Sequence, residues 1–569
     1  MKNVRSQVAR SFSRLFTLLL ICLALSAPVF PQAQAAPQIG PGLAPIQHYI
    51  ANAWDTLTRS MSECGSIVDP KIKAAAVLYL PADFAAPPAV EKLHSACNVQ
   101  IEHLPKVLDR LGEIDTTRFQ PQGLLYLPNK YVVPGGRFNE MYGWDSYFII
   151  RGLVRAGRVD LAKDMVENFF FEIEHYGGAM LNANRTYYLT RSQPPYLSSM
   201  VMSVYEAQKQ AGHADNAWLA RAYSYLNRDY ALWVREPHLA GNTGLSRYYD
   251  FGDGPPAEAL QDESGFYRKA VTYFLLHGDS ADHYLVEHPA DSQEKTLGMS
   301  YSVSVCDIPT TMARPECEAK RAVSLSADYY KGDRSMRESG FDVSFRFGPF
   351  SAATHHYAPV CLNSLLYKTE TDLEQIAEIL DKTDEAAQWK KRAGARKQAM
   401  NQYLWSPEWG RFVDYDVQNG VQSSYVYAAM FYPMWAGVAT AEQAAAIMRH
   451  LGSLEEPGGI AMSAYESGAQ WDFPFGWAPM QLVGVEGMRR YGFNREADRV
   501  SMEFLSMVKE NFRKEGTIHE KYDVVARSWQ TKVEAGYQIN VVGFGWTNGV
   551  FLELLHQLPK ADVEQLEKE

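Results

Sequence analysis

The chain has 569 residues, of which 46% are hydrophobic and 12% aromatic, so it can bury a large core as several domains or as one large closed architecture. Its 66 acidic residues outnumber its 55 basic residues, and the formal net charge is -11 at pH 7. A chain with this negative balance is not expected to bind nucleic acid or an anionic membrane surface.

Residues 1–35 have the pattern of a secretory signal peptide. Basic residues precede an apolar run over 15–25, and Ala33 and Ala35 supply small residues at the usual spacing before a cleavage site. The run is too short to span a bilayer, and no other stretch approaches about 18 apolar residues. We therefore expect a mature chain of residues 36–569 that is exported to the periplasm, or out of the cell where the host has no outer membrane.

Five cysteines remain in the expected mature chain, and export would place them where disulfides persist. Sequence proximity favours two pairs and one thiol left over, namely Cys64–Cys97, Cys306–Cys317 and Cys361. Other pairings stay open, because sequence alone does not fix connectivity.

A segment typical of a sugar pocket lies at 134–145. It gathers one guanidinium, two carboxylates and three aromatic rings into twelve residues. The apolar C–H faces of a sugar stack on rings such as Trp144, and charged forks such as Arg137 and Asp145 hydrogen-bond its hydroxyls. The alternative is the start of an aromatic-rich helix with a surface ion pair.

Helical periodicity follows this segment and recurs along the chain, whereas strand alternation hardly occurs. Apolar residues on one face predict early helices over 159–174, 196–211 and 216–234. The same plan predicts late helices over 441–451, 479–491 and 495–512. Helices joined by short glycine-marked turns are antiparallel neighbours, and a long series of them forms an open solenoid or a closed toroid. No fixed-period repeat favours the solenoid.

The region 280–335 departs from this plan. It is polar, and it contains prolines and the second cysteine pair. We interpret it as an insertion, either a disulfide-pinned flap at the rim of a pocket or a decorative surface loop.

The sequence shows no pattern for a metal site or another cofactor. Neither CxxC nor HxxxH spacing occurs, and the 14 histidines, which include the adjacent His355 and His356, follow no metal-ligand pattern. We therefore expect no metal and no other cofactor.

A second segment, 470–479, has the same character as the first. It contains two tryptophans, an aspartate and two prolines, which make a rigid, aromatic and polar loop before the predicted helix over 479–491. Its presence favours the sugar-pocket interpretation of 134–145.

These two segments resemble the two signature motifs of the trehalases, the glycoside hydrolases that split α,α-trehalose into two glucoses. The resemblance covers about residues 115–557 in family order and continues through Asn182, Arg191–Pro195, Glu338–Asp342, Glu520–Val524 and Gly543–Gly549. It implies an all-α fold, an (α/α)6 barrel or toroid whose loops form a deep pocket at one end. It also implies that residues 36–569 are a single catalytic domain.

Two carboxyl groups are needed to hydrolyse an acetal, one to protonate the departing oxygen and one to activate water. Asp342 lies among phenylalanines, an apolar setting that favours a protonated carboxyl group near neutral pH. The resemblance places the general acid at Asp342. It places the general base at Glu520, whose charged sequence neighbours would also suit an ordinary surface residue.

The resemblance further implies a set of sugar contacts, since arginine forks and amides suit vicinal hydroxyls. This set is Arg137, Trp144, Asp145, Asn182, Arg191, Ser192, Gln193 and the backbone at Gly340. Two places depart from the family pattern. The segment 255–258 keeps Glu258 but lacks the usual arginine, and the segment 533–537 offers Glu534 as a candidate for the family's late glutamate.

The sequence therefore predicts an exported, monomeric, inverting α,α-trehalase that releases one glucose as the β anomer and one as the α anomer. Two alternatives stay open, a related exo-acting glucosidase on the same barrel and a sugar-binding or sensing protein without turnover. Retention of both Asp342 and Glu520 argues against a pure binder, because binding alone needs no acid and base pair.

Overall fold

The computed structural model describes residues 42–68, 76–258, 265–277, 282–288, 301–303 and 321–569. Residues 38–569 form one compact unit. The predicted signal peptide and the predicted Cys306–Cys317 pair lie outside the described residues, as does much of the predicted insertion.

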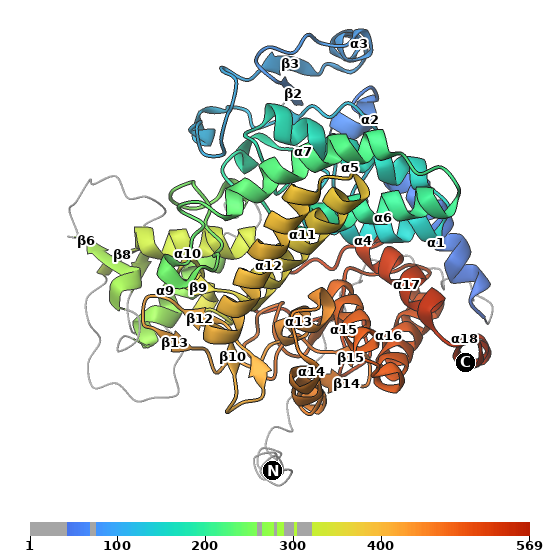
Figure 1. Cartoon of the computed structure of the whole chain (residues 1–569). Coiled ribbons are helices and arrows are strands. Elements are labelled where there is room, and N and C mark those ends of the chain that lie inside the picture. The colour runs from blue at the N-terminus through green and yellow to red at the C-terminus, as the bar shows by residue number, and fades with distance from the viewer. Residues whose placement is uncertain (1–41, 69–75, 259–264, 278–281, 289–300, 304–320) are drawn as a thin grey trace, which may run out of the picture. The chain divides into compact units, whose positions relative to one another are not determined.

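Six helices of the described chain pack in a closed ring. They are α4 (Gly143–Arg155), α6 (Leu197–Gln210), α11 (Val360–Ile379), α13 (Tyr432–Ala436), α15 (Ala478–Arg490) and α17 (Gly545–Gln557). Each helix contacts the next in this order, and α17 contacts α4, so the first and last members close the circle (Figure 1). Closure selects the toroid over the solenoid, the two arrangements that helical periodicity leaves open.

A second layer of helices packs against the ring. Its members and their partners are α5 (Val159–His175) on α4 and α6, α7 (Asn216–Trp233) on α6 and α11, α12 (Thr383–Tyr403) on α11, α16 (Asn494–Glu515) on α15 and α17, and α1 (Ala44–Leu57) on α17. The other described helices are α2 (Cys64–Ile67), α3 (Pro88–Cys97), α9 (Phe266–Leu276), α10 (Ala327–Glu338), α14 (Ala441–Met448) and α18 (Lys560–Lys568). The expected all-α (α/α)6 barrel is confirmed.

The six predicted helices are present as α5, α6, α7, α14, α15 and α16, and their ends differ from the predicted ends by three residues or fewer. Local signals explain this accuracy. The Asp215 side chain accepts a hydrogen bond from the N–H of Trp218 and so starts α7. Gly516 takes a left-handed conformation and ends α16.

A glycine pair brings α4 and α17 into backbone contact. A β-carbon on Gly549 would lie 2.1 Å from the carbonyl oxygen of Phe148, and one on Gly152 would lie 2.5 Å from the α-carbon of Gly549. No side chain fits at either position, so the two helices approach more closely than larger residues allow. This contact closes the ring.

Short strands connect the helices. They are β1 (Thr58–Arg59), β2 (Val77–Leu80), β3 (Gln100–His103), β4 (Leu124–Leu125), β5 (Tyr131–Val132), β6 (Leu285–His288), β7 (Tyr301–Val303), β8 (Arg321–Leu325), β9 (Tyr357–Ala358), β10 (Trp405–Ser406), β11 (Arg411–Phe412), β12 (Tyr415–Asp416), β13 (Val421–Gln422), β14 (Glu455–Glu456), β15 (Gly459–Ile460), β16 (Phe475–Trp477) and β17 (Lys521–Asp523). Three sheets have three strands, in the orders β3-β2-β4, β6-β8-β7 and β13-β12-β9. The first is parallel and the other two are antiparallel.

The cysteine predictions are tested in part. A disulfide joins Cys64 of α2 to Cys97 at the end of α3, which confirms that pair. Cys361 is free and buried in α11, as expected for the cysteine left over.

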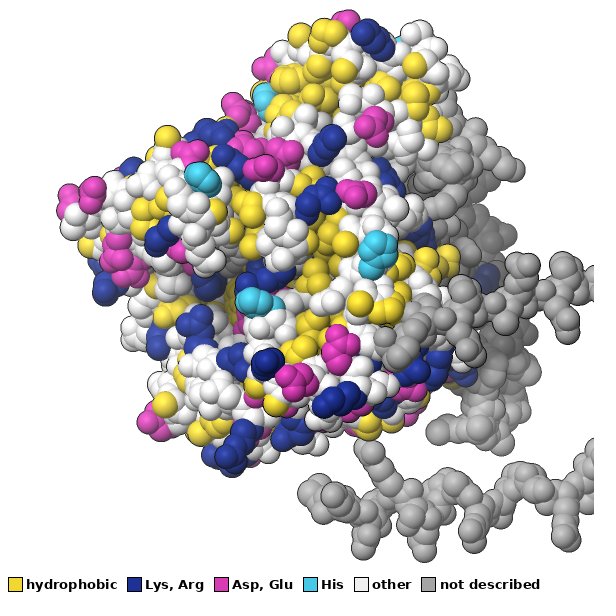
Figure 2. All heavy atoms as spheres, turned by 90° about the vertical axis from the view of Figure 1, so that its right-hand side faces the viewer, with side chains coloured by type: hydrophobic (Ala, Val, Ile, Leu, Met, Phe, Trp, Pro, Cys, Tyr) yellow, Lys and Arg dark blue, Asp and Glu magenta, His cyan; other side chains and the backbone are white. Residues whose placement is uncertain are grey.

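Two features of the described residues are relevant to binding of nucleic acid or membranes, namely the distribution of surface charge and the hydrophobicity of the helices. On the face drawn in Figure 2, acidic and basic side chains are interspersed, and neither sign forms a continuous patch there. No described helix is both long enough and apolar enough to cross a bilayer.

Candidate active site

A cavity of about 370 Å³ opens where several helices of the ring begin. That volume is within the range of small-molecule sites, about 300–1,000 Å³. Ten aromatic side chains line it, namely Phe138, Tyr142, Trp144, Tyr187, Tyr188, Trp471, Trp477, Tyr537, Phe544 and Trp546. Four arginines and five carboxylates share the lining, namely Arg137, Arg185, Arg191, Arg337, Glu140, Asp145, Glu258, Asp342 and Glu520. Aromatic faces mixed with charged forks suit a sugar.

Most of the predicted site residues meet in this cavity. They are Arg137, Trp144, Asp145, Asn182, Arg191, Gln193, Glu258, Gly340, Asp342 and Glu520. Ser192 does not line it. Its Oγ donates a hydrogen bond to the carbonyl of Met180 at 2.6 Å and so connects the segment around Arg191 to the segment before Asn182. Glu534 does not line it either, because its side chain is 66% exposed and lies 3.7 Å from Lys532.

The turn before Asp342 is shaped by Gly340. Gly340 follows α10 with φ +76, and a β-carbon there would lie 2.8 Å from Cε2 of Trp144. Both the left-handed conformation and the close approach of the indole ring require glycine. The main chain that carries Asp342 is therefore seated directly against Trp144.

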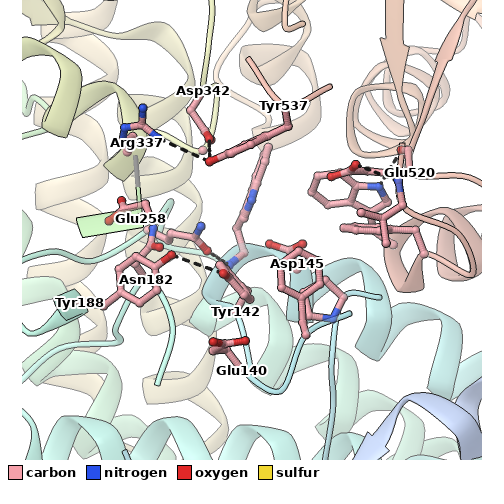
Figure 3. Close-up of a pocket in the computed structure, with 18 of the residues that line it drawn as sticks. Glu140, Tyr142, Asp145, Asn182, Tyr188, Glu258, Arg337, Asp342, Glu520 and Tyr537 are labelled. Carbon is pink, nitrogen blue, oxygen red and sulfur yellow. Dashed lines mark hydrogen bonds between the residues drawn. The ribbon is translucent and has the colours of Figure 1, made fainter. Parts of the chain in front are cut away.

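Hydrogen bonds orient the Asp342 carboxyl group. The Tyr537 hydroxyl donates to its Oδ2 at 3.0 Å, and Nη1 of Arg337 donates to the Tyr537 hydroxyl at 3.4 Å (Figure 3). The Gln470 side-chain amide donates to the carbonyl oxygen of Asp342. Backbone and side chain are thus held by different partners.

Glu520 lies immediately before β17, which pairs with β16. Its Oε2 accepts a hydrogen bond from the N–H of Val541 at 3.4 Å and lies 3.8 Å from Nζ of Lys521. Burial raises the pKa of Glu520, and Lys521, the Val541 N–H and Arg137 offset part of that rise. In Figure 3 Glu520 and Asp342 extend from different walls of the cavity, with Asp145 between and below them.

Asp145 lies in the first turn of α4 and is 5% exposed. Burial raises the pKa of Asp145 well above its usual range, and the nearby charges of Glu520 and Asp342 add to this rise. A carboxyl group in this setting holds a proton more readily than a surface aspartate and can then donate a hydrogen bond to a sugar hydroxyl.

The opposite part of the cavity is built on Arg191. Its guanidinium pairs with Glu258, lies 3.5 Å from Asp250 and stands 4.8 Å from the centre of the Tyr188 ring. Burial disfavours the charged form of Glu258, but Arg191 and Arg337 outweigh it and lower the pKa of this carboxyl group. Arg337 of α10 thus supplies a second positive charge near Glu258, whose own segment lacks the family's arginine.

Several cavity residues were not predicted. Arg337 and Tyr537 fall inside or beside the motif segments, so their position in the sequence is a usable signal. Glu140 lies within 134–145, and its Oε1 accepts a hydrogen bond from Nε of Arg185 at 2.5 Å. Arg185 follows no recognisable pattern, and only the fold brings it to Glu140.

Comparisons with known proteins agree on one family. The family model described as Trehalase matches residues 69–274 and 283–559. The chain is 35% identical over 516 residues to a cytosolic neutral trehalase of Neurospora crassa, covering 84% of this chain and 63% of that protein. It is 33% identical over 559 residues to a cytosolic neutral trehalase of Saccharomyces cerevisiae, covering 88% of this chain and 69% of that protein.

A solved structure extends the similarity to three dimensions. The neutral trehalase Nth1 from Saccharomyces cerevisiae superposes with a TM-score of 0.72 at 31% sequence identity, covering 92% of this chain and 96% of that one. The chain spans less than two thirds of the Neurospora crassa relative, 63% of its length.

These relatives overturn the prediction of export. The Neurospora crassa and Saccharomyces cerevisiae proteins are named as cytosolic enzymes, so the predicted signal peptide at 1–35, export and periplasmic location are wrong. The pattern behind that prediction is a short basic and apolar stretch that lies outside the family match. The similarity to the cytosolic enzymes, in contrast, extends over most of the chain.

Proposed function

The chain belongs to the trehalase family, and on this premise we propose that it cleaves α,α-trehalose into two glucose molecules by an inverting mechanism. The observation that carries the proposal is the placement of Asp342 and Glu520 on different walls of one aromatic cavity (Figure 3). Hydrolysis with inversion needs two carboxyl groups on either side of the scissile bond, about 6.5–9.5 Å apart, so that a water molecule fits beside the base.

In the proposed reaction Asp342 is the general acid. Its Oδ2 accepts the hydrogen bond from Tyr537, so the acidic proton resides on Oδ1, which is the oxygen available to the substrate. This proton passes to the glycosidic oxygen as the bond between that oxygen and the anomeric carbon breaks. The leaving glucose departs as the α anomer.

Glu520 is the proposed general base. It takes a proton from water as the water oxygen bonds to the anomeric carbon from the opposite face, and this half of the substrate becomes β-glucose. The base must be ionised, and Lys521, the Val541 N–H and Arg137 favour the ionised form against the effect of burial.

The remaining predicted residues are proposed to bind the two sugar rings. Guanidiniums such as those of Arg137 and Arg191 fit pairs of hydroxyls, and the Trp144 ring offers an apolar surface for a sugar face. Asp145, Asn182, Gln193, Glu258 and the backbone at Gly340 complete the proposed set.

We also propose that the barrel is a single catalytic domain that acts as a monomer and contains an insertion at about 280–335. The described strands of that region, β6, β7 and β8, form a sheet with one another, which supports an insertion with its own local structure.

The anomeric form of the first products tests the mechanism. Proton NMR of trehalose hydrolysis within minutes, before mutarotation, should show equal amounts of α- and β-glucose, whereas products that are initially all α would contradict inversion. Asp342→Asn and Glu520→Gln should each abolish most turnover while circular dichroism stays unchanged. Glucose release from maltose or sucrose at a rate similar to that from trehalose would instead support the broader glucosidase.

A further inference from the structure

Four side chains that commonly bind metals meet at the start of α10, away from the proposed active site. Asp328 lies in the first turn of α10, His355 and His356 lie in the turn before β9, and His283 lies in the turn before β6. None of them lines the cavity described above.

Backbone pairing brings these separate segments together. Strands β6 and β8 are antiparallel, with Leu285 opposite Leu325, and the N–H of Ser326 donates to the carbonyl of Tyr284 at 2.9 Å. The residue before Tyr284 and the first turn of α10 therefore lie at the same end of this sheet. That end is where His283 and Asp328 come together.

One ligand atom from each of Asp328, His355 and His356 lies within 4.8 Å of the other two, and His283 lies beside this group at the second carboxylate oxygen of Asp328. Oδ1 of Asp328 lies 3.0 Å from Nε2 of His355 and 3.6 Å from Nε2 of His356. Oδ2 of Asp328 lies 3.8 Å from Nε2 of His283. Ligand atoms about 2.0–2.1 Å from a tetrahedral ion stand about 3.3–3.4 Å from one another.

We propose that Asp328, His355 and His356 form a structural site for a divalent transition-metal ion of the zinc type. Two imidazoles and a carboxylate suit zinc, whereas calcium and magnesium prefer oxygen ligands. Three protein ligands leave the fourth position to a water molecule, and we assign the site a structural role because none of the three lines the proposed active-site cavity.

The two histidines crowd around one carboxylate. The ring centres of His355 and His356 are 3.9 Å apart, His355 is 6% exposed, and its Nε2 is at hydrogen-bond distance from Oδ1 of Asp328. An ion bound among the three side chains would give them one common partner.

The site would connect a peripheral region to the active site. A bound ion would link the first turn of α10 to the turn before β9. Helix α10 runs from there to Glu338, and Gly340 and Asp342 follow directly. The ion would therefore fix the far end of the helix that leads into the proposed general acid.

Calorimetric titration of the full-length, chelator-treated protein tests the site with Zn²⁺ and, in parallel, with Mg²⁺. We expect one equivalent of Zn²⁺ to bind, no saturable heat with Mg²⁺, and a rise in Tm with Zn²⁺ that EDTA reverses. The absence of Zn²⁺ binding, or equal binding of Mg²⁺, would overturn the proposal.

Matched variants locate the bound ion. The double variants H355Q/H356Q and H283Q/D328N should each weaken Zn²⁺ binding at least about 100-fold, because loss of even an outer-shell partner costs about 10–100-fold. The control H48Q/H103Q removes two exposed histidines elsewhere and should keep the full equivalent. The side chains replaced in H283Q/D328N are more exposed, at 59% and 38%. This variant therefore tests the site if H355Q/H356Q does not fold. Retention of the equivalent in a folded H283Q/D328N protein would refute the site.

Discussion

Replacing Lys521 by methionine should move the acidic limb of the activity profile to higher pH. Lys521 is fully buried, and its Nζ donates to the side-chain oxygen of Gln470 at 3.0 Å and to the carbonyls of Tyr537 and Ile539 at 3.2 and 3.3 Å. Three donated hydrogen bonds use all three N–H groups of an ammonium, so Lys521 is a cation here. It lies 3.8 Å from Oε2 of Glu520 and stabilises the ionised carboxylate.

The size of the shift follows from the 3.8 Å separation. Two unit charges about 4 Å apart attract by about 1 kcal/mol in water and by about 4 kcal/mol at an effective dielectric constant of 20. One pKa unit corresponds to about 1.36 kcal/mol, so loss of the Lys521 charge should raise the pKa of Glu520 by about 0.7 to 3 units. The proposed base acts only when ionised, so activity is present above this pKa and is lost as the pH falls through it. The acidic limb of kcat/KM therefore shifts upward by the same amount.

The measurement is the pH dependence of kcat/KM for trehalose hydrolysis, with circular dichroism at each pH to follow folding. Methionine leaves the three acceptors of Lys521 without their partner, so the variant should also melt earlier. Lys509→Met is a matched control, because Lys509 is 2% exposed and donates to the carbonyl of Leu566, outside the cavity. This control should lose stability without a shift of the acidic limb.

Two outcomes would refute the reasoning. An acidic limb that stays in place in a folded Lys521→Met protein would mean that Glu520 is not the titrating base. A shift of equal size in Lys509→Met would show that the limb reports stability and not the ionisation of one carboxylate.

Three further changes test the site and the fold. Tyr537→Phe removes one hydrogen bond to the proposed acid, worth about 1.5–3 kcal/mol, and should lower kcat about 10- to 100-fold with little change in Tm; unchanged kcat would contradict its orienting role. Arg137→Ala should lower kcat/KM by roughly two to three decades while Tm stays near that of the wild type. Trp144→Ala should lower kcat/KM by a similar factor. Because the Trp144 ring is buried, this variant should also lose about 3–5 kcal/mol of unfolding free energy in a denaturant titration. Joint replacement of Cys64 and Cys97 by serine removes a disulfide that closes a loop with a separation of 33 residues, and should lower the free energy of unfolding by about 3–4 kcal/mol. The wild type measured under reducing conditions is the control and should be as stable as the variant. A variant as stable as the oxidised wild type would contradict the prediction.

Local signals made the helices predictable from sequence. The hydrophobic periodicity, the capping residue and the terminal glycine of a helix all lie within or next to its own segment, as Asp215 at the start of α7 and Gly516 after α16 show. Closure of the ring is a different kind of property, because it depends on contact between α4 and α17 at opposite ends of the barrel sequence. Periodicity carries no information on such a contact, and only the family resemblance supplied it.

The candidate active site likewise contains residues that sequence motifs predict and residues that only the fold brings together. Asp342 and Glu520 lie in recognisable motifs, and the structure brings both to one cavity. The pairing of Glu140 with Arg185 joins two segments that carry no shared pattern, so sequence gave no sign of it. Glu534 is the opposite case, because this residue of suitable type in a matching segment does not line the cavity, and its side chain is exposed to solvent.

One buried amide connects the segments that carry the proposed acid and the proposed base. An inverting enzyme needs a gap for water between the two carboxyl groups, so the groups cannot be fixed by contact with each other. Gln470, which is 1% exposed, spans that gap from behind: its Nε2 donates to the carbonyl of Asp342, and its Oε1 accepts from Nζ of Lys521 at 3.0 Å and from the N–H of Tyr537 at 3.2 Å. Lys521 adjoins Glu520, and Tyr537 binds the carboxyl group of Asp342. Gln470 therefore connects the segments that carry the two carboxyl groups, although it has no part in the proposed proton transfers.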